Sequence, residues 1–63
     1  MNTTSTPAAY DLGRTAARET ARSLCEPNWA MIARQPAAFE FGFRYEWTQY
    51  VLPARAFQAA VTA

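Results

Sequence analysis

The sequence has no histidine, no lysine, a single cysteine and only two glycines. Without histidine the chain lacks the usual general base and the commonest zinc ligand, so we expect no enzyme, no catalytic residue, no metal site and no cofactor. Gly13 and Gly42 are too far apart to form a phosphate-binding loop. A lone Cys25 cannot close a disulfide within the chain, which indicates a reducing compartment, and we expect it to be a small buried side chain.

Long apolar runs are also missing. The longest extends from Trp29 to Ala33, far short of the roughly 20 residues that cross a membrane. The first positive charge, Arg14, follows a polar stretch at residues 2–6, which is the wrong order for a secretory signal. We therefore expect a cytoplasmic protein with no membrane partner.

The charge balance is close to neutral, with six arginines against five acidic residues and a formal net charge of +1. This argues against a strongly basic nucleic-acid-binding module. The chain is 51% hydrophobic and 14% aromatic, which predicts an ordered core or interface. A chain of this length buries only about 60% of the surface of its unfolded form. We therefore expect it to self-associate or to be stable only with a partner.

The sequence predicts a flexible N-terminal arm at residues 1–6, followed by a single small helical domain at 7–63. Thr6 and Pro7 are suited to the start of a helix that runs to about Leu24. One face of this helix carries mostly small side chains: Tyr10, Gly13, Ala17, Ala21 and Leu24. A separate basic stripe consists of Arg14, Arg18 and Arg22, interpreted mainly as a solvated face with an alternative role in binding nucleic acid.

Prolines divide the second half. Pro27 predicts a break, Asn28 a cap for a short helical turn at 29–34, and Pro36 the start of another helix. Pro53 is expected to interrupt that helix, leaving a short final helix at 54–61 with Phe57 facing inward.

Residues 39–47 are ambiguous because aromatic and polar residues alternate, as in a half-buried strand. No other strand pattern exists in the chain, and a single strand is unstable without an intermolecular partner. We therefore prefer a helix and an all-α fold, a small helical hairpin with short additional helices. The alternative is an α+β fold in which one strand at 39–47 pairs with another molecule. Glu40 and Glu46 are expected on a solvated face.

Tyr10 lies three residues before Gly13, and Phe39 lies three residues before Gly42, with Cys25, Glu26 and Pro27 between the two elements. This arrangement resembles the ribosome modulation factor family over about half of the chain. The resemblance implies two helices in a hairpin that closes through the two glycines, with ribosomal RNA as the partner.

The nine aromatic residues exceed what a two-helix core can enclose, and interfaces favour arginine over lysine. We therefore expect a non-catalytic protein-binding module, a small bacterial or bacteriophage accessory protein that modulates or inhibits a larger host machine. The expected partner-binding residues are Phe41, Arg44, Tyr45, Trp47 and Tyr50. The alternative is a ribosome- or RNA-binding factor in which the basic stripe contacts phosphates while Tyr45 or Trp47 stacks on bases.

Overall fold

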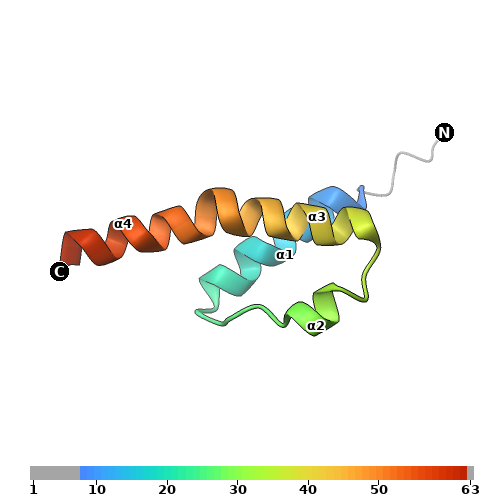
Figure 1. Ribbon diagram of the computed structural model, residues 1–63, viewed down its shortest axis with the longest axis horizontal. Helices are drawn as coiled ribbons and strands as arrows, with labels where there is room; N and C mark the ends of the chain where they lie inside the picture. The colour runs from blue at the N-terminus through green and yellow to red at the C-terminus, as the bar shows by residue number, and fades with distance from the viewer. Residues whose placement is uncertain (1–7, 63) are drawn as a thin grey trace.

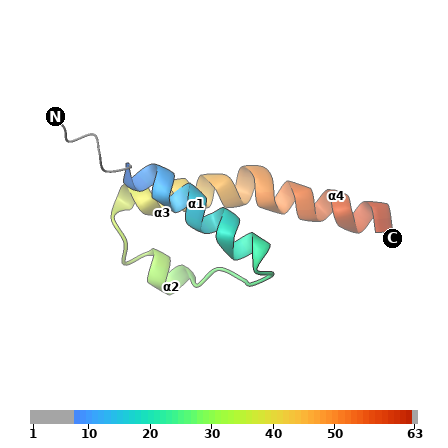
Figure 2. The same cartoon turned by 180° about the vertical axis from the view of Figure 1, so that it is seen from behind.

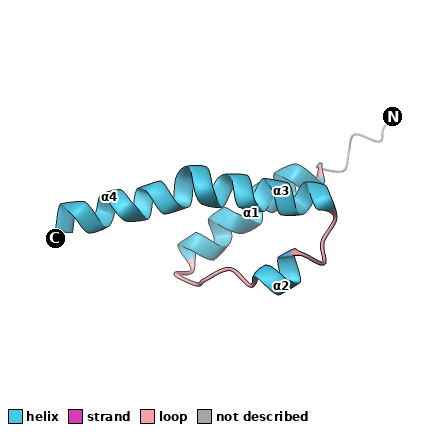
Figure 3. Ribbon diagram, viewed as in Figure 1, coloured by secondary structure: helices cyan, strands magenta, loops and turns pink. Residues whose placement is uncertain are grey.

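The computed structural model describes residues 8–62, which form helices joined by short connections (Figures 1 and 3). The elements in chain order are α1 (Ala9–Arg22), α2 (Trp29–Ile32), α3 (Ala37–Glu46), the π-helical turn η2 (Trp47–Val51) and α4 (Leu52–Thr62). The all-α fold class is confirmed, and the alternative strand at 39–47 is wrong. The predicted arm at 1–6 and the helix start at Thr6 and Pro7 lie outside the described residues.

The two main helices are α1 and the continuous rod formed by α3, η2 and α4. Figures 1 and 2 show from opposite sides that both begin at the same end of the molecule and run in the same direction. The connection from Ser23 to Pro36, which contains α2, returns the chain to the end of the molecule where α1 begins, and α3 starts there. The helices cross near their starts and diverge towards the ends.

The crossing depends on the two glycines, as the sequence predicted. Gly13 lies against the backbone of Phe39, and Gly42 lies against the backbone of Tyr10. A Cβ atom added at Gly13 would lie 2.9 Å from the Phe39 carbonyl carbon, and one added at Gly42 would lie 2.9 Å from the Tyr10 carbonyl carbon. Each helix therefore contributes one glycine and one aromatic backbone to a reciprocal contact that no larger residue fits.

The core is small and lies where α1, α2, α3 and η2 meet. Its buried apolar residues are Ala17, Ile32, Phe43, Trp47 and Val51. Phe43 and Trp47 stack with ring centroids 5.9 Å apart, and the half-exposed Trp29 closes over both rings edge-on. Only two of the nine aromatic rings are buried, so most aromatic surface faces outward, as expected from their number.

The connection after α1 corrects two expectations. The helix ends at Arg22, and the Leu24 and Cys25 amides donate back to the Ala21 and Thr20 carbonyls, which forms a Schellman motif. Leu24 adopts the left-handed conformation, with φ of 60°, and is 87% exposed rather than part of the inner face. Cys25 is also exposed rather than buried.

The predicted cap and short turn are present in the return segment. The Asn28 side chain accepts a hydrogen bond from the Met31 amide at 3.1 Å, and α2 ends two residues earlier than predicted, at Ile32. The next helix begins directly after Pro36, as the sequence indicated.

Pro53 does not interrupt the long helix, contrary to expectation. The Leu52 amide donates to the Trp47 carbonyl five residues earlier, so the turn before Pro53 is wider than an α-helical turn. A wider turn eases the clash between the proline ring and the preceding turn, and α4 continues from Leu52 to Thr62.

The end of this rod stands apart from the core. No residue of α4 is buried, and Phe57 is 70% exposed rather than inward-facing. The molecule extends 51 × 24 × 17 Å, with a radius of gyration of 13.5 Å. A compact chain of this length would have a radius of gyration of roughly 11 Å. The protein is therefore elongated because α4 projects beyond the packed helices.

Candidate binding surface

Three exposed aromatic side chains follow one side of the long helix. Phe41 and Tyr45 are four residues apart in α3, so they share a face. The Tyr50 ring lies 6.0 Å from the Tyr45 ring, and Tyr10 of α1 reaches the other side of Tyr45 at 6.3 Å. We name Phe41, Tyr45 and Tyr50 the aromatic surface, and all three are exposed.

The π turn allows the two tyrosines to meet. Tyr45 and Tyr50 are five residues apart, a spacing at which side chains on a regular α-helix diverge. Because η2 holds one residue more per turn, the two rings reach edge-to-face contact at an interplanar angle of 70°. The aromatic surface is therefore continuous from α3 to η2.

Arg14 is fixed beneath this pair of rings. Its guanidinium carbon lies 5.2 Å from the centre of the Tyr45 ring and 5.6 Å from the centre of the Tyr50 ring. Its Nε atom donates to Glu46 Oε1 at 2.8 Å, and this hydrogen bond is the main reason that the pKa of Arg14 is raised above its ordinary value. The cation holds the two tyrosines in place from the side of α1.

Glu46 connects the surface to the core. It is only 6% exposed and accepts hydrogen bonds from Arg14 and, at 3.2 Å, from Arg18 Nε. A buried carboxylate needs such partners because removing it from water is costly. The expectation that Glu46 lies on a solvated face is therefore wrong, because the carboxylate bridges two positions of α1.

The pKa of Tyr45 is raised above its ordinary value, first by a hydrogen bond with Tyr50 and then by charge repulsion from the same neighbour. Both effects disfavour the tyrosinate form. Tyr45 therefore stays a neutral hydroxyl, able to donate or accept a hydrogen bond on the exposed surface.

The structure separates the other two predicted partner-binding residues from this surface. Arg44 pairs with Glu40 at 3.0 Å and lies over the Trp29 ring at 5.0 Å, so it covers the side facing α2. Trp47 is 4% exposed and belongs to the core, so its predicted role as an exposed contact is wrong. The alternation of residues 39–47 did not reveal that Trp47 faces α1 once the segment is helical.

The basic stripe carries little free charge. Arg14 and Arg18 share Glu46, and Arg22 pairs with Glu19 at 3.2 Å. Sequence reasoning missed Glu46 and Tyr10 as parts of the site, because their contacts depend on the direction in which α1 and α3 pack. The only available signal was the four-residue spacing of Arg14 and Arg18, which lets both reach one acceptor on a neighbouring helix.

A groove opens where α1 and the long helix diverge. Its volume is about 460 Å³, and its lining consists of Arg18, Ala21, Arg22 and Leu24 from the α1 side and Tyr50, Val51, Ala54 and Arg55 from the long helix. Arg55 crosses the Trp47 ring at 4.8 Å and pairs with Glu26 at 3.0 Å. The groove thus has an apolar floor and three arginines along it.

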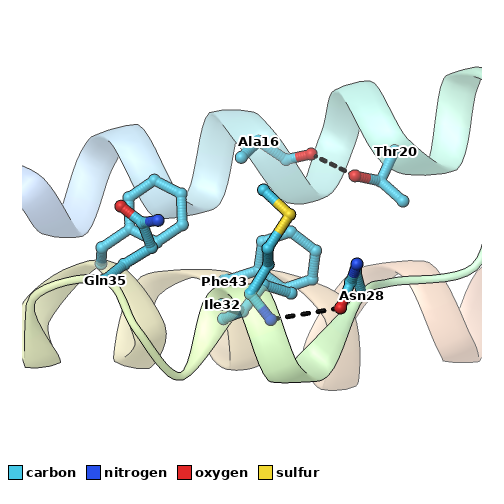
Figure 4. A pocket seen from close by; sticks show the side chains of 8 residues that line it. Ala16, Thr20, Asn28, Ile32, Gln35 and Phe43 are labelled. Carbon is cyan, nitrogen blue, oxygen red and sulfur yellow. Dashed lines mark hydrogen bonds between the residues drawn. The ribbon is translucent and has the colours of Figure 1, made fainter.

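A second, smaller cavity of about 180 Å³ lies between α1, α2 and α3 (Figure 4). Two of its polar side chains already have partners, since Thr20 Oγ1 donates to the Ala16 carbonyl at 2.8 Å and Asn28 caps α2. Small-molecule pockets usually have volumes of about 300–1,000 Å³ with converging polar groups. This cavity is therefore a packing gap under α2 rather than a convincing ligand site.

Within residues 8–62, no group of three or more metal-ligating side chains occurs. None of the described helices is long and apolar enough to cross a membrane. In comparisons with known proteins, the chain matches no family, no curated protein and no solved structure.

Proposed function

We propose that this protein is a non-catalytic binding module that docks on another protein through the aromatic surface. The observation that carries the proposal is the fixed arrangement of Tyr45 and Tyr50 around Arg14, next to Phe41, which is 68% exposed. Tyrosine and arginine are enriched among the residues that dominate binding energy. Side chains that are ordered before binding lose less entropy when a partner is bound.

The ion pairs that the arginines form support a protein partner rather than RNA. Two arginines of the basic stripe neutralise Glu46, and the third pairs with Glu19. Phosphate binding needs cations that are free to replace counterions. An aromatic surface with its charges already paired is better suited to a protein surface than to a nucleic-acid backbone.

The small, elongated form supports an accessory role. In our proposal the module modulates or inhibits a larger bacterial or bacteriophage machine by occupying one of its surfaces. It needs no active site of its own for this, because an anchored side chain that fills a partner's pocket is sufficient to block or stabilise that region.

The test is affinity capture from the native host with the full chain, followed by measurement of the dissociation constant for the captured partner. Tyr45→Ala and Phe41→Ala should each weaken binding by at least about 30-fold, since loss of an interface anchor typically costs 2 kcal/mol or more. Met31→Ala is the matched control, because Met31 is also a large exposed apolar residue but lies on α2. It should change the affinity by less than about threefold.

Salt and nuclease treatment separate protein from RNA binding. Capture through the aromatic surface should survive nuclease treatment and change little between about 50 and 200 mM salt, whereas phosphate binding falls steeply over this range. Arg22→Ala should have no effect, because Arg22 is exposed and pairs only with Glu19. Loss of capture in Arg22→Ala, with Tyr45→Ala still bound, would overturn the proposal in favour of RNA.

A further inference from the structure

Within residues 8–62, the face of α4 that carries Phe57 and Val61 has no partner. Tyr50, Ala54, Phe57 and Val61 follow one another at spacings of four, three and four residues, so they form one apolar stripe. Phe57 and Val61 are exposed, and no residue of α4 is buried. α4 continues from η2 as the end of the long helix and packs against no other helix of the described residues, so its apolar stripe faces water.

We propose that the occupant of this face is a second copy of the chain. In the proposed dimer, two α4 helices pack antiparallel about a two-fold axis next to Phe57, and the end of each α4 lies over the other copy's groove. The resulting contact is isologous, so the same stripe serves both copies. This inference concerns α4 and the groove. It shares Tyr50 with the aromatic surface but does not involve Phe41 or Tyr45, so Phe57 is the residue that tests it.

The register of the two helices supports this arrangement. With the two-fold axis at Phe57, antiparallel pairing places residue 60 of one copy opposite residue 54 of the other, and residue 62 opposite residue 52. Ala54 lies on the floor of the groove. In this register the last turn of each α4 therefore lies over the groove of the other copy, while the two Phe57 rings meet at the axis.

The charges of the groove are compatible with the same occupant, because its three arginines are paired with Glu46, Glu19 and Glu26 but keep further N–H donors. The groove is lined by Arg18, Arg22 and Arg55. The final carbonyl groups of a helix lack intrahelical partners and carry the negative end of the helix dipole, which favours nearby cations. The only charged residue of α4 is Arg55, already paired with Glu26, so the helix brings little like-charge repulsion of its own.

The available area is sufficient for a weak dimer. Leu24, Tyr50, Phe57 and Val61 are all exposed, and together they present roughly 500 Å² per copy. Burying this surface on both copies removes about 1,000 Å² from water, which is near the lower limit for a specific interface. The expected product is a weak dimer.

Sedimentation of the full chain in a Cys25→Ser background tests the proposal, because exposed Cys25 could otherwise link copies by itself. Phe57→Asp should weaken association by at least about 30-fold. Ala59→Asp is the matched control, since Ala59 lies on the opposite side of α4 and is also exposed. It should weaken association by less than about threefold, and circular dichroism of both variants should match that of the parent.

Cross-linking tests the geometry. Phe57→Cys should form a disulfide-linked dimer on mild oxidation, because the two-fold axis brings the two copies of this position together. Ala59→Cys should form no disulfide-linked dimer under the same conditions, with both variants made in the Cys25→Ser background. A protein that is monomeric up to about 200 µM overturns the proposal. Equal effects at positions 57 and 59 also overturn it, as does association that is lost in Tyr45→Ala but retained in Phe57→Asp.

Discussion

Replacing Gly42 with alanine should destabilise the protein, although this change normally stabilises a helix by about 1 kcal/mol. The added Cβ would lie 2.9 Å from the Tyr10 carbonyl carbon, whereas carbon atoms pack best at about 3.5–4.0 Å. The obstacle is backbone, which no change of side-chain rotamer can remove. The two helices must therefore separate by about 1 Å, which forfeits a quarter to a half of the dispersion energy at each affected contact.

Overpacking of this kind typically costs about 1–3 kcal/mol, and the upper end applies because backbone meets backbone. After the gain in helix propensity, the expected net loss is about 2 kcal/mol. A chain of 63 residues has a total stability of roughly 3–9 kcal/mol, so this loss is readily measured. Urea unfolding followed by circular dichroism gives the free energy directly.

A double-mutant cycle sharpens this test. Gly13→Ala should cost a similar amount, and the double variant should cost clearly less than the sum, because one separation of the helices relieves both contacts. Thr15 provides the control, since it is exposed in the middle of α1, and Thr15→Ala should be about 1 kcal/mol more stable than Thr15→Gly. A Gly42→Ala protein that is more stable than the parent would refute the reasoning.

Three further outcomes follow from the structure. Glu46→Gln should lower the free energy of unfolding by about 1–3 kcal/mol in urea titrations, because it weakens a buried acceptor for two arginines. The control Glu26→Gln, at an exposed ion pair, should have little effect. Leu24→Gly should raise the melting temperature, since glycine relieves the left-handed strain and the lost side chain is exposed, with a gain of up to about 1 kcal/mol. Stability should fall as the pH rises above about 10. The reason is that the pKa of Tyr45 is raised in the folded protein, which therefore holds the tyrosine proton more tightly than the unfolded chain does. Tyr45→Phe should reduce this fall in melting curves recorded from pH 8 to 11.

The sequence predicted the features that depend on local chemistry. Asn28 and Pro36 mark helix starts by their own hydrogen-bonding and backbone preferences, and both are observed. The close contacts at Gly13 and Gly42 were also predictable, because a glycine within a helix has few other uses than close packing. Helix was preferred over strand at 39–47 since the chain offered no second strand, and this interpretation is confirmed.

The errors arise where a residue's environment depends on distant parts of the chain. Glu46 is buried because α1 and α3 run in the same direction, which brings Arg14 and Arg18 to it. Pro53 remains inside a helix because the turn before it is π-helical, and single-residue propensities do not indicate such a turn. Trp47 was predicted as a partner contact because nothing in its local pattern distinguishes a core tryptophan from an exposed one.

The π turn also determines the direction in which the side chains of α4 face relative to those of α3. One residue of an α-helix corresponds to a rotation of about 100°, so deleting one residue within η2 would turn every side chain of α4 by that amount about the helix axis. The core residues of α3 would keep their positions, while Phe57 and Val61 would face a different direction. Single-residue insertions and deletions in this turn would therefore change the direction that the α4 side chains face without disturbing the packed crossing of α1 and α3.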